Sequence, residues 1–355
     1  MRIVVTGATG NIGTAVLRRL AGTGHQLVGL ARRLPEGLPD VEWRTVDLTT
    51  VSVEQLAGIL GGADAVVHLA WGFQPSHDID HLEELGVGGT RRVVEAVARA
   101  DVPHLVHLSS VGAYSPRSDD TPVTESYPTG GVPTSPYSRH KAAAERILDR
   151  FEAETAASPG RGTTVTRMRP GIVGQRTAGS ALLRYGVPGA IPRRALHLLP
   201  VLPLDRGLRI PVVHADDVAD AVARALEGRV GGPFNLAADD PLTAADIARG
   251  LGAKLVHVPS EVLRPVVAAT WRMRLQQIDE GWLDMAYALP LLDTTRARSE
   301  LGWGATRSAV EVFAEAVEGM RSGASGPTPV LRRRTVPGAL RDAVRRGPVA
   351  RRTRP

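Results

Sequence analysis

A short apolar strand that runs straight into a glycine-rich turn constrains the fold of this chain most. Residues Ile3–Thr6 supply the strand, and Gly7, Gly10 and Gly13 follow as an amphipathic helix opens over 12–22. A glycine in the turn permits positive φ, a second removes a Cβ where a diphosphate would approach, and a third lets the helix pack on the strand. The helix N-terminus adds free N–H groups and a positive dipole end. This pattern predicts a dinucleotide-binding βαβ unit, rather than a tight turn without a ligand.

The first half of the chain continues this alternation of short apolar runs and amphipathic stretches. The expected strands are 3–6, 26–31, 42–47, 65–69, 104–109 and 163–167, and the expected helices are 12–22, 53–60, 82–100 and 137–156. Such alternation is typical of a Rossmann-type, doubly wound parallel α/β sheet. We expect a dinucleotide-binding core over 1–170. A smaller, irregular substrate-binding region with returning core elements should cover 171–322, and a disordered, arginine-rich tail 323–355.

Composition excludes several classes of protein. The 355 residues contain no cysteine, so disulfides, thiolate metal sites and cysteine nucleophiles are ruled out. The sequence has neither an apolar run of about 18 residues nor a signal-peptide pattern at its start, so we expect a cytoplasmic protein without a membrane span. The formal charge is +6, but residues 323–355 hold nine arginines and one acid, which leaves −2 for the rest. Nucleic-acid binding is therefore not expected of the folded body.

Tyr137 and Lys141 form the strongest catalytic pattern. They stand four residues apart on an expected helix, so they share one face, and Lys141 is one of only two lysines in the chain. A phenol normally loses its proton near pH 10, and a neighbouring ammonium should lower that pKa. The alternative is an ordinary solvent-facing pair. A serine nucleophile is a poor interpretation, because no G-x-S-x-G turn surrounds Ser109 or Ser110.

Three motifs together resemble the extended short-chain dehydrogenase/reductase superfamily, also called the NAD-dependent epimerase/dehydratase family. They are the G-x-x-G-x-x-G turn, Tyr-x-x-x-Lys at 137–141 and Ser-Ser-x-x-x-Tyr at 109–114. The resemblance implies that Tyr137 moves the hydroxyl proton and that Lys141 also holds the nicotinamide ribose. It implies that Ser110 binds the substrate oxygen, with Ser109 as the alternative. It also implies a small-molecule substrate and a homodimer formed through the two long helices.

The cofactor residues follow from the same comparison. An acid after the second strand would bind the ribose of NAD, whereas Arg32 and Arg33 stand there in this chain and suit the 2′-phosphate of NADP. We therefore favour NADP over NAD. The resemblance places Asp47 and Leu48 at the adenine. The expected cofactor contacts are Gly7, Thr9, Gly10, Asn11, Ile12, Gly13, Arg32, Arg33, Asp47, Leu48, Leu69, Ala70, Lys141 and Pro170.

Two departures from the family pattern limit the choice of reaction. Gly86 stands where the family usually has Asn, and the Asn and Tyr frequent in nucleotide-sugar members are missing after Arg169-Pro170. We expect an NAD(P)-dependent oxidoreductase acting on a carbonyl or alcohol. The alternatives are an epimerase or dehydratase that recycles its cofactor and a non-catalytic NADP-sensing or scaffold protein. No metal is expected, because His77 and His81 lack a third ligand at fixed spacing.

Overall fold

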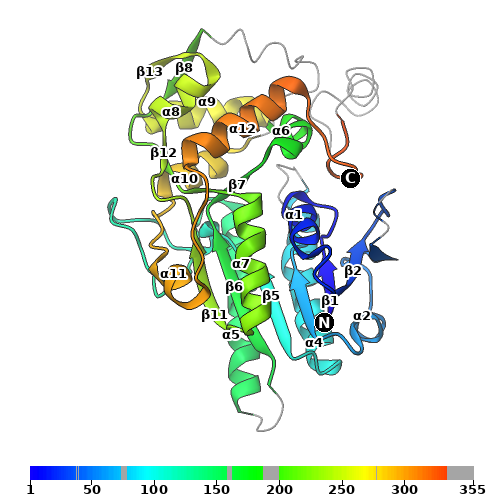
Figure 1. The fold of residues 1–355 in the computed structure, drawn as a ribbon. Coiled ribbons are helices and arrows are strands. Elements are labelled where there is room, and N and C mark those ends of the chain that lie inside the picture. The colour runs from blue at the N-terminus through cyan, green and yellow to red at the C-terminus, as the bar shows by residue number, and fades with distance from the viewer. Residues whose placement is uncertain are drawn as a thin grey trace.

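A seven-stranded parallel sheet forms the centre of the computed structural model, which describes residues 1–36, 38, 40–72, 78–157, 162–186, 200–276 and 278–333 (Figure 1). Its strand order is β11-β6-β5-β4-β1-β2-β3, and every neighbouring pair is parallel. The strands are β1 Arg2–Thr6, β2 Gln26–Ala31, β3 Val41–Thr45, β4 Ala65–His68, β5 His104–Leu108, β6 Thr164–Pro170 and β11 Gly232–Leu236. The order reverses between β1 and β4, and in such sheets the crevice at this point binds the ligand.

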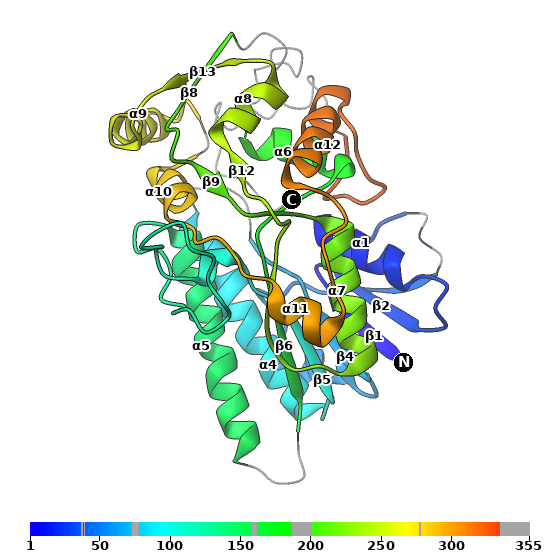
Figure 2. The same ribbon diagram turned by 60° about the vertical axis from the view of Figure 1, so that its left-hand side comes forward.

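Helices cover both faces of the sheet, as Figures 1 and 2 show. On one face α1 (Asn11–Leu20) and α7 (Ala215–Gly228) pack on the sheet through an alanine- and valine-rich core. On the other face α2 (Val53–Leu60), α4 (Gly89–Arg99) and α5 (Pro136–Ala156) bury leucine, valine and phenylalanine side chains. Strands covered on both faces must be apolar throughout, and β4 and β5 are fully buried. The predicted Rossmann-type fold is confirmed.

The predicted helix over 82–100 is divided in the structure. It consists of α3 (Ile79–Glu83), a π-helical turn over Glu84–Gly88, and α4. The buried Thr90 side chain donates to the carbonyl of Gly86 at 2.7 Å, so this hydroxyl accepts from Nε2 of His68 at 3.2 Å. By contrast, α2 begins as expected, with the capping box of Ser52 and Gln55. π-Turns inside helices are frequent at functional sites, and this one faces the cavity described below.

The second region is built of short elements. Three two-stranded sheets pair β10 with β7, β12 with β9 and β13 with β8. The strands are β7 Ile172–Gly174, β8 Val201–Leu204, β9 Arg209–Ile210, β10 Val212–His214, β12 Leu242–Thr243 and β13 Lys254–His257. The helices are α6 Gly179–Gly186, α8 Ala244–Leu251, α9 Ser260–Arg272, α10 Glu280–Ala288, α11 Thr295–Leu301 and α12 Ala309–Ser322. Among the described residues, none of the helices combines the length and the apolar character needed to span a bilayer.

The chain does not become a loose tail directly after α12. Residues Gly323–Arg333, which we call the return segment, run back toward the N-terminal half of α1 (Figure 1). Thr328 and Leu331 are each 1% exposed. The composition from residue 323 onward is poor in large apolar residues and therefore predicts a disordered tail. The buried Thr328 and Leu331 show that residues 323–333 instead pack on the folded body. Residues 334–355 lie outside the described part of the chain.

Candidate active site

The glycine turn between β1 and α1 has the geometry expected of a phosphate-binding turn. Gly7 has φ of +67°, and a Cβ there would lie 2.6 Å from the backbone nitrogen of Ala70. A Cβ on Gly13 would lie 2.3 Å from the carbonyl oxygen of Gly7, whereas one on Gly10 would meet only that oxygen, at 3.2 Å. Gly7 and Gly13 are therefore required by the fold itself. Gly10 is the position that leaves room for a ligand at the N-terminus of α1.

A cavity of about 350 Å³ is lined by this turn and by the expected catalytic residues. Ser110, Tyr137 and Lys141 all contribute to its wall, so the structure brings the three together beside the turn. The expected cofactor contacts that line it are Gly7, Thr9, Gly10, Asn11, Ile12, Gly13, Arg32, Arg33, Leu48, Leu69, Ala70, Lys141 and Pro170. These residues come from segments that are more than a hundred positions apart in the sequence. They lie close together because the carboxyl ends of the parallel strands meet at one edge of the sheet.

Arg32 lies where β2 ends, at the same cavity. Its Nη1 is buried and has no hydrogen-bond partner among the described residues. A buried guanidinium nitrogen without a partner is costly unless a ligand supplies an acceptor. Asp47 is placed differently: it does not line the cavity, and its Oδ1 accepts from the backbone nitrogen and hydroxyl of Thr49 at 3.0 and 2.7 Å. A role for Asp47 at the adenine therefore stays a prediction, while neighbouring Leu48 does face the cavity.

Ser110 and Tyr137 are neighbours at the cavity wall, since a Cβ on Gly112 would meet both the Tyr137 ring and, at 3.4 Å, the Ser110 Oγ. Ser110 follows β5 and its Oγ accepts from the backbone nitrogen of Gly112 at 3.0 Å. A Cβ on Gly112 would lie 2.9 Å from the Tyr137 ring, so glycine at this position lets the ring approach the serine. The Ser138 hydroxyl fixes the start of α5 by donating to the Gly112 carbonyl at 2.5 Å. The two hydroxyls are thus held together by local packing.

The pKa of Tyr137 is raised, whereas the sequence predicted that it would be lowered. Burial raises it to about 12, although the neighbouring Ser110 hydroxyl acts to lower it. The expected neighbour Lys141 instead donates from Nζ to the carbonyl of Leu108 at 2.8 Å and is only 2% exposed. Burial lowers the pKa of Lys141 to about 7, and the charge of Glu145 opposes this change. The charge of Lys141 was expected to act on the phenol, but desolvation dominates for both groups.

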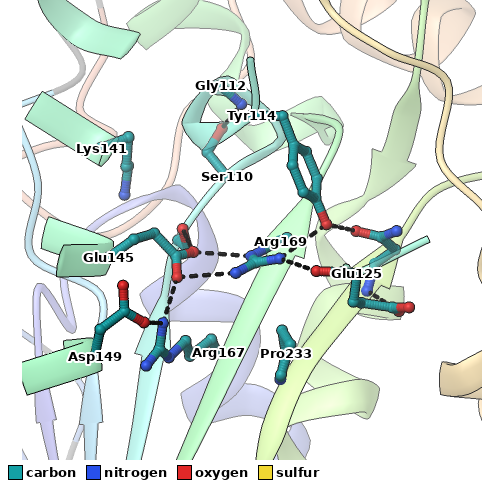
Figure 3. Close-up of polar contacts among 12 residues, drawn as sticks. Ser110, Gly112, Tyr114, Glu125, Lys141, Glu145, Asp149, Arg167, Arg169 and Pro233 are labelled. Carbon is teal, nitrogen blue, oxygen red and sulfur yellow. Dashed lines mark hydrogen bonds and ion pairs between the residues drawn. The ribbon is translucent and has the colours of Figure 1, made fainter. Parts of the chain in front are cut away.

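An ion-pair network beneath the site holds the loop that carries the serines (Figure 3). Glu145 of α5 accepts from the Ser109 hydroxyl at 2.5 Å and from Arg169 Nε at 2.9 Å. Burial acts to raise the pKa of Glu145, but the hydrogen bond and charge of Arg169 and the charge of Arg167 lower it to about 2. Arg169 also donates to the hydroxyl of Tyr114 at 3.0 Å. Both serines line the cavity, but the Ser109 hydroxyl proton is committed to Glu145, so Ser110 is the serine that suits a contact with the substrate oxygen.

Two tryptophans that sequence analysis did not single out complete the site. The ring centroid of Trp282, from α10, lies 5.1 Å from that of Tyr137, and the Trp71 ring meets Tyr137 edge-on at 6.4 Å. A Cβ on Gly86 would lie 3.0 Å from the Trp71 ring, so the departure from the family's Asn makes room for this indole. The unusual Gly86 was the sequence signal that could have revealed the contact with Trp71. No local motif marked Trp282, because it arrives from a helix about 145 residues further along the chain.

Metal binding finds no support in the described part of the chain, where no cluster of three His, Asp or Glu side chains could hold an ion. His77, one member of the sequence pair with His81, lies outside the described residues.

A doubly wound parallel sheet whose glycine turn shares a cavity with a tyrosine and a lysine defines a nucleotide-binding protein of the Rossmann class. The chain belongs to the NAD-dependent epimerase/dehydratase family, whose model matches residues 3–237. The predicted family is confirmed.

Individual relatives are more distant. An uncharacterized Mycobacterium tuberculosis protein is 29% identical over 327 residues, which cover 90% of this chain and 30% of the relative. This chain thus spans about a third of that relative's length. The dTDP-6-deoxy-L-talose 4-dehydrogenase (NAD(P)(+)) of Kitasatospora kifunensis is 29% identical over 88% of this chain and 94% of that enzyme. The structure of a Thermotoga maritima UDP-glucose 4-epimerase shares the fold, with a TM-score of 0.68, 21% identity, and coverage of 91% and 99%.

Proposed function

We propose that this protein is an NAD(P)-dependent oxidoreductase that transfers a hydride between nicotinamide and a small-molecule carbonyl or alcohol, with Ser110, Tyr137 and Lys141 as catalytic residues. The observation that carries the proposal is that the Ser110 and Tyr137 side chains are neighbours at a cavity that the glycine turn also lines. Two neighbouring hydroxyls can both bind a carbonyl oxygen and protonate it.

The proposed reduction of a carbonyl follows from the protonation state of Tyr137. NAD(P)H, when bound, supplies the hydride that forms the new C–H bond. The electron pair of the C=O π bond moves to oxygen, which takes the proton of Tyr137. A Tyr137 pKa of about 12 keeps that proton in place at neutral pH, so the resting site is prepared to reduce a carbonyl. Ser110 donates a hydrogen bond to the same oxygen. Lys141, one helical turn along α5, is assigned the ribose contact that the resemblance implies.

Arg32 supports NADP as the preferred cofactor. Its buried Nη1 has no partner among the described residues, and Arg33 lies at the same cavity. Burial and the nearby charges of Arg332 and Arg32 lower the pKa of Arg33. Guanidinium groups brought together in this way favour binding a doubly charged phosphate.

The walls beside Tyr137 indicate the character of the substrate. Trp71, Leu85, Trp282, Met285 and Leu289 line this end of the cavity. We therefore propose a substrate with an apolar ring or chain next to the reacting carbon, because such a group removes apolar surface from water here.

Steady-state kinetic assays with NADPH and a panel of aromatic and alicyclic ketones test the proposal. We expect stoichiometric NADPH oxidation, and a Tyr137→Phe variant should lose about 10²- to 10⁴-fold in kcat while its Kd for NADPH stays within twofold. Tyr127→Phe is a matched control, since Tyr127 hydrogen-bonds Pro116 away from the cavity.

Two results would overturn the proposal. Isomerisation or dehydration of a sugar nucleotide without added NADP(H), by protein that retains tightly bound cofactor, would favour the epimerase or dehydratase. Full retention of cellular function by Tyr137→Phe would favour a non-catalytic sensor.

A further inference from the structure

The return segment is anchored to the substrate region before it reaches the glycine turn. The Ser180 side chain of α6 donates to the carbonyl of Gly323 at 3.1 Å, and its backbone nitrogen donates to Ala324 at 2.9 Å. Gly326 donates to the carbonyl of Leu331 at 2.9 Å, which folds the segment into a closed loop. These bonds give residues 323–331 a defined path.

The far end of the segment is bonded to the turn itself. The hydroxyl of Thr328 donates to the carbonyl oxygen of Thr9 at 2.8 Å, and both residues are nearly fully buried. Thr9 lies between Gly7 and Gly10, so the contact falls inside the expected phosphate-binding turn. Because the bond uses the Thr9 carbonyl, it fixes the turn without consuming a backbone N–H that a phosphate would need.

The segment also forms part of the cavity wall. Pro329, Val330 and Leu331 line the same cavity as Arg32 and Ile12. Leu331 is 1% exposed and packs on Ala178 and Ala181, so this wall is held by a small apolar cluster. Arg332 directly follows Leu331, and its charge acts on Arg33, which lines the same cavity as Leu331. The segment therefore brings a third guanidinium near the two that line the cavity.

We propose that the return segment is an integral wall of the NADP site, with Thr328 holding it on the glycine turn and Arg332 joining Arg32 at the 2′-phosphate. This inference rests on the proposed function, because it assumes that the cavity takes a 2′-phosphorylated dinucleotide. It assigns cofactor affinity to residues about 320 positions away from the glycine turn in sequence.

Fluorescence titrations of the full-length chain with NADPH and NADH test the inference. Arg332→Ala should raise the Kd for NADPH about tenfold, the loss of one charge-assisted hydrogen bond, and leave the Kd for NADH within twofold. Arg333→Ala is the matched control, because Arg333 is as exposed as Arg332 but is not among the charges that act on Arg33, and it should change neither value. Thr328→Val, which keeps the shape of the side chain, should weaken both nucleotides several-fold because the turn binds the diphosphate they share.

The outcomes separate the two proposals. Failure of the wild type to bind either nucleotide would remove the proposed function itself. Normal wild-type binding, with Arg332→Ala and Thr328→Val both indistinguishable from it, would overturn only the inference on the segment. Tighter binding by Thr328→Val would also overturn it, since the segment would then obstruct the site. A parallel loss with NADPH and NADH in Arg332→Ala would exclude a contact with the 2′-phosphate.

Discussion

The ammonium nitrogen of Lys141 lies 3.6 Å from the centre of the Trp71 ring. The indole covers a cation that is already enclosed by the protein and bonded to the Leu108 carbonyl. Cation–π contacts of this kind stabilise a desolvated ammonium. The contact offsets only part of the cost of burial, because the pKa of Lys141 still falls to about 7.

The first prediction concerns the pH dependence of stability that this burial causes. The pKa of Lys141 is about 7 when folded and about 10.4 when unfolded. Between these two pH values the unfolded chain therefore holds the Lys141 proton that the folded chain has lost. The resulting loss in the free energy of unfolding is complete below pH 7 and disappears as the pH rises toward 10.

Replacing Lys141 with Met should stabilise the fold at pH 6 by on the order of a few kcal/mol relative to the wild type. Urea denaturation at pH 6, 7.5 and 9 should show this advantage shrinking as the pH rises. Lys254→Met is the control, because Lys254 is exposed and is the only other lysine. An advantage that is constant with pH would contradict the explanation.

The second prediction tests why glycine stands at position 86. Gly86→Asn should lower the free energy of unfolding by about 1–3 kcal/mol, because its Cβ would meet the Trp71 ring at 3.0 Å. Adding Trp71→Leu should recover much of that loss in a double-mutant cycle. Gly58→Asn in α2 controls for helix propensity, since a Cβ there meets nothing within 4 Å. Equal losses at the two glycines would show that the indole is not the cause.

The third prediction isolates the role of Arg32. Arg32→Ala should raise the Kd for NADPH about 10- to 100-fold, the value of a charged hydrogen bond to phosphate, while that for NADH changes little. Isothermal titration calorimetry with both nucleotides measures the difference. The exposed Arg249 pairs only with Asp246 among its described contacts, so Arg249→Ala serves as the control. Equal wild-type affinities for NADPH and NADH would refute the preference for NADP.

The fourth prediction concerns the buried histidines of β4 and β5 in the central sheet. Burial lowers the pKa of His68 to about 3 and that of His104 to about 4, and lowers that of His107 well below its usual value. The unfolded chain takes up these protons near pH 6.5, so stability should fall as the pH drops from 6.5 toward 4. Each histidine should cost up to about 2 kcal/mol at pH 5.

Replacing His104 with Gln should flatten that acid slope, measured as the urea midpoint between pH 7 and pH 5. Glutamine can still donate to the Thr166 hydroxyl that His104 contacts at 2.8 Å. Substituting the exposed His257 gives the control. An unchanged slope in His104→Gln would show that other groups take up the protons.

The sequence predicted well what short-range patterns encode. The glycine turn and the succession of strands and helices depend on spacing within about ten residues, and they determine the fold. Tyr137 and Lys141 do line the same cavity, as their spacing predicts, while their catalytic roles stay a prediction. The direction of the Tyr137 pKa could not be obtained in this way, because it depends on how completely the folded chain excludes water from the phenol. The same holds for Trp282 and the return segment, which reach the site from distant parts of the sequence.

The bond from Thr328 to Thr9 joins residues 319 positions apart. During synthesis the strands and helices of the N-terminal half emerge first and can associate early. The glycine turn must then exist for most of that time without its partner, and its last stabilising contact forms only when almost the whole described chain is available. The glycine turn therefore reaches its final set of contacts only after the return segment has been synthesised.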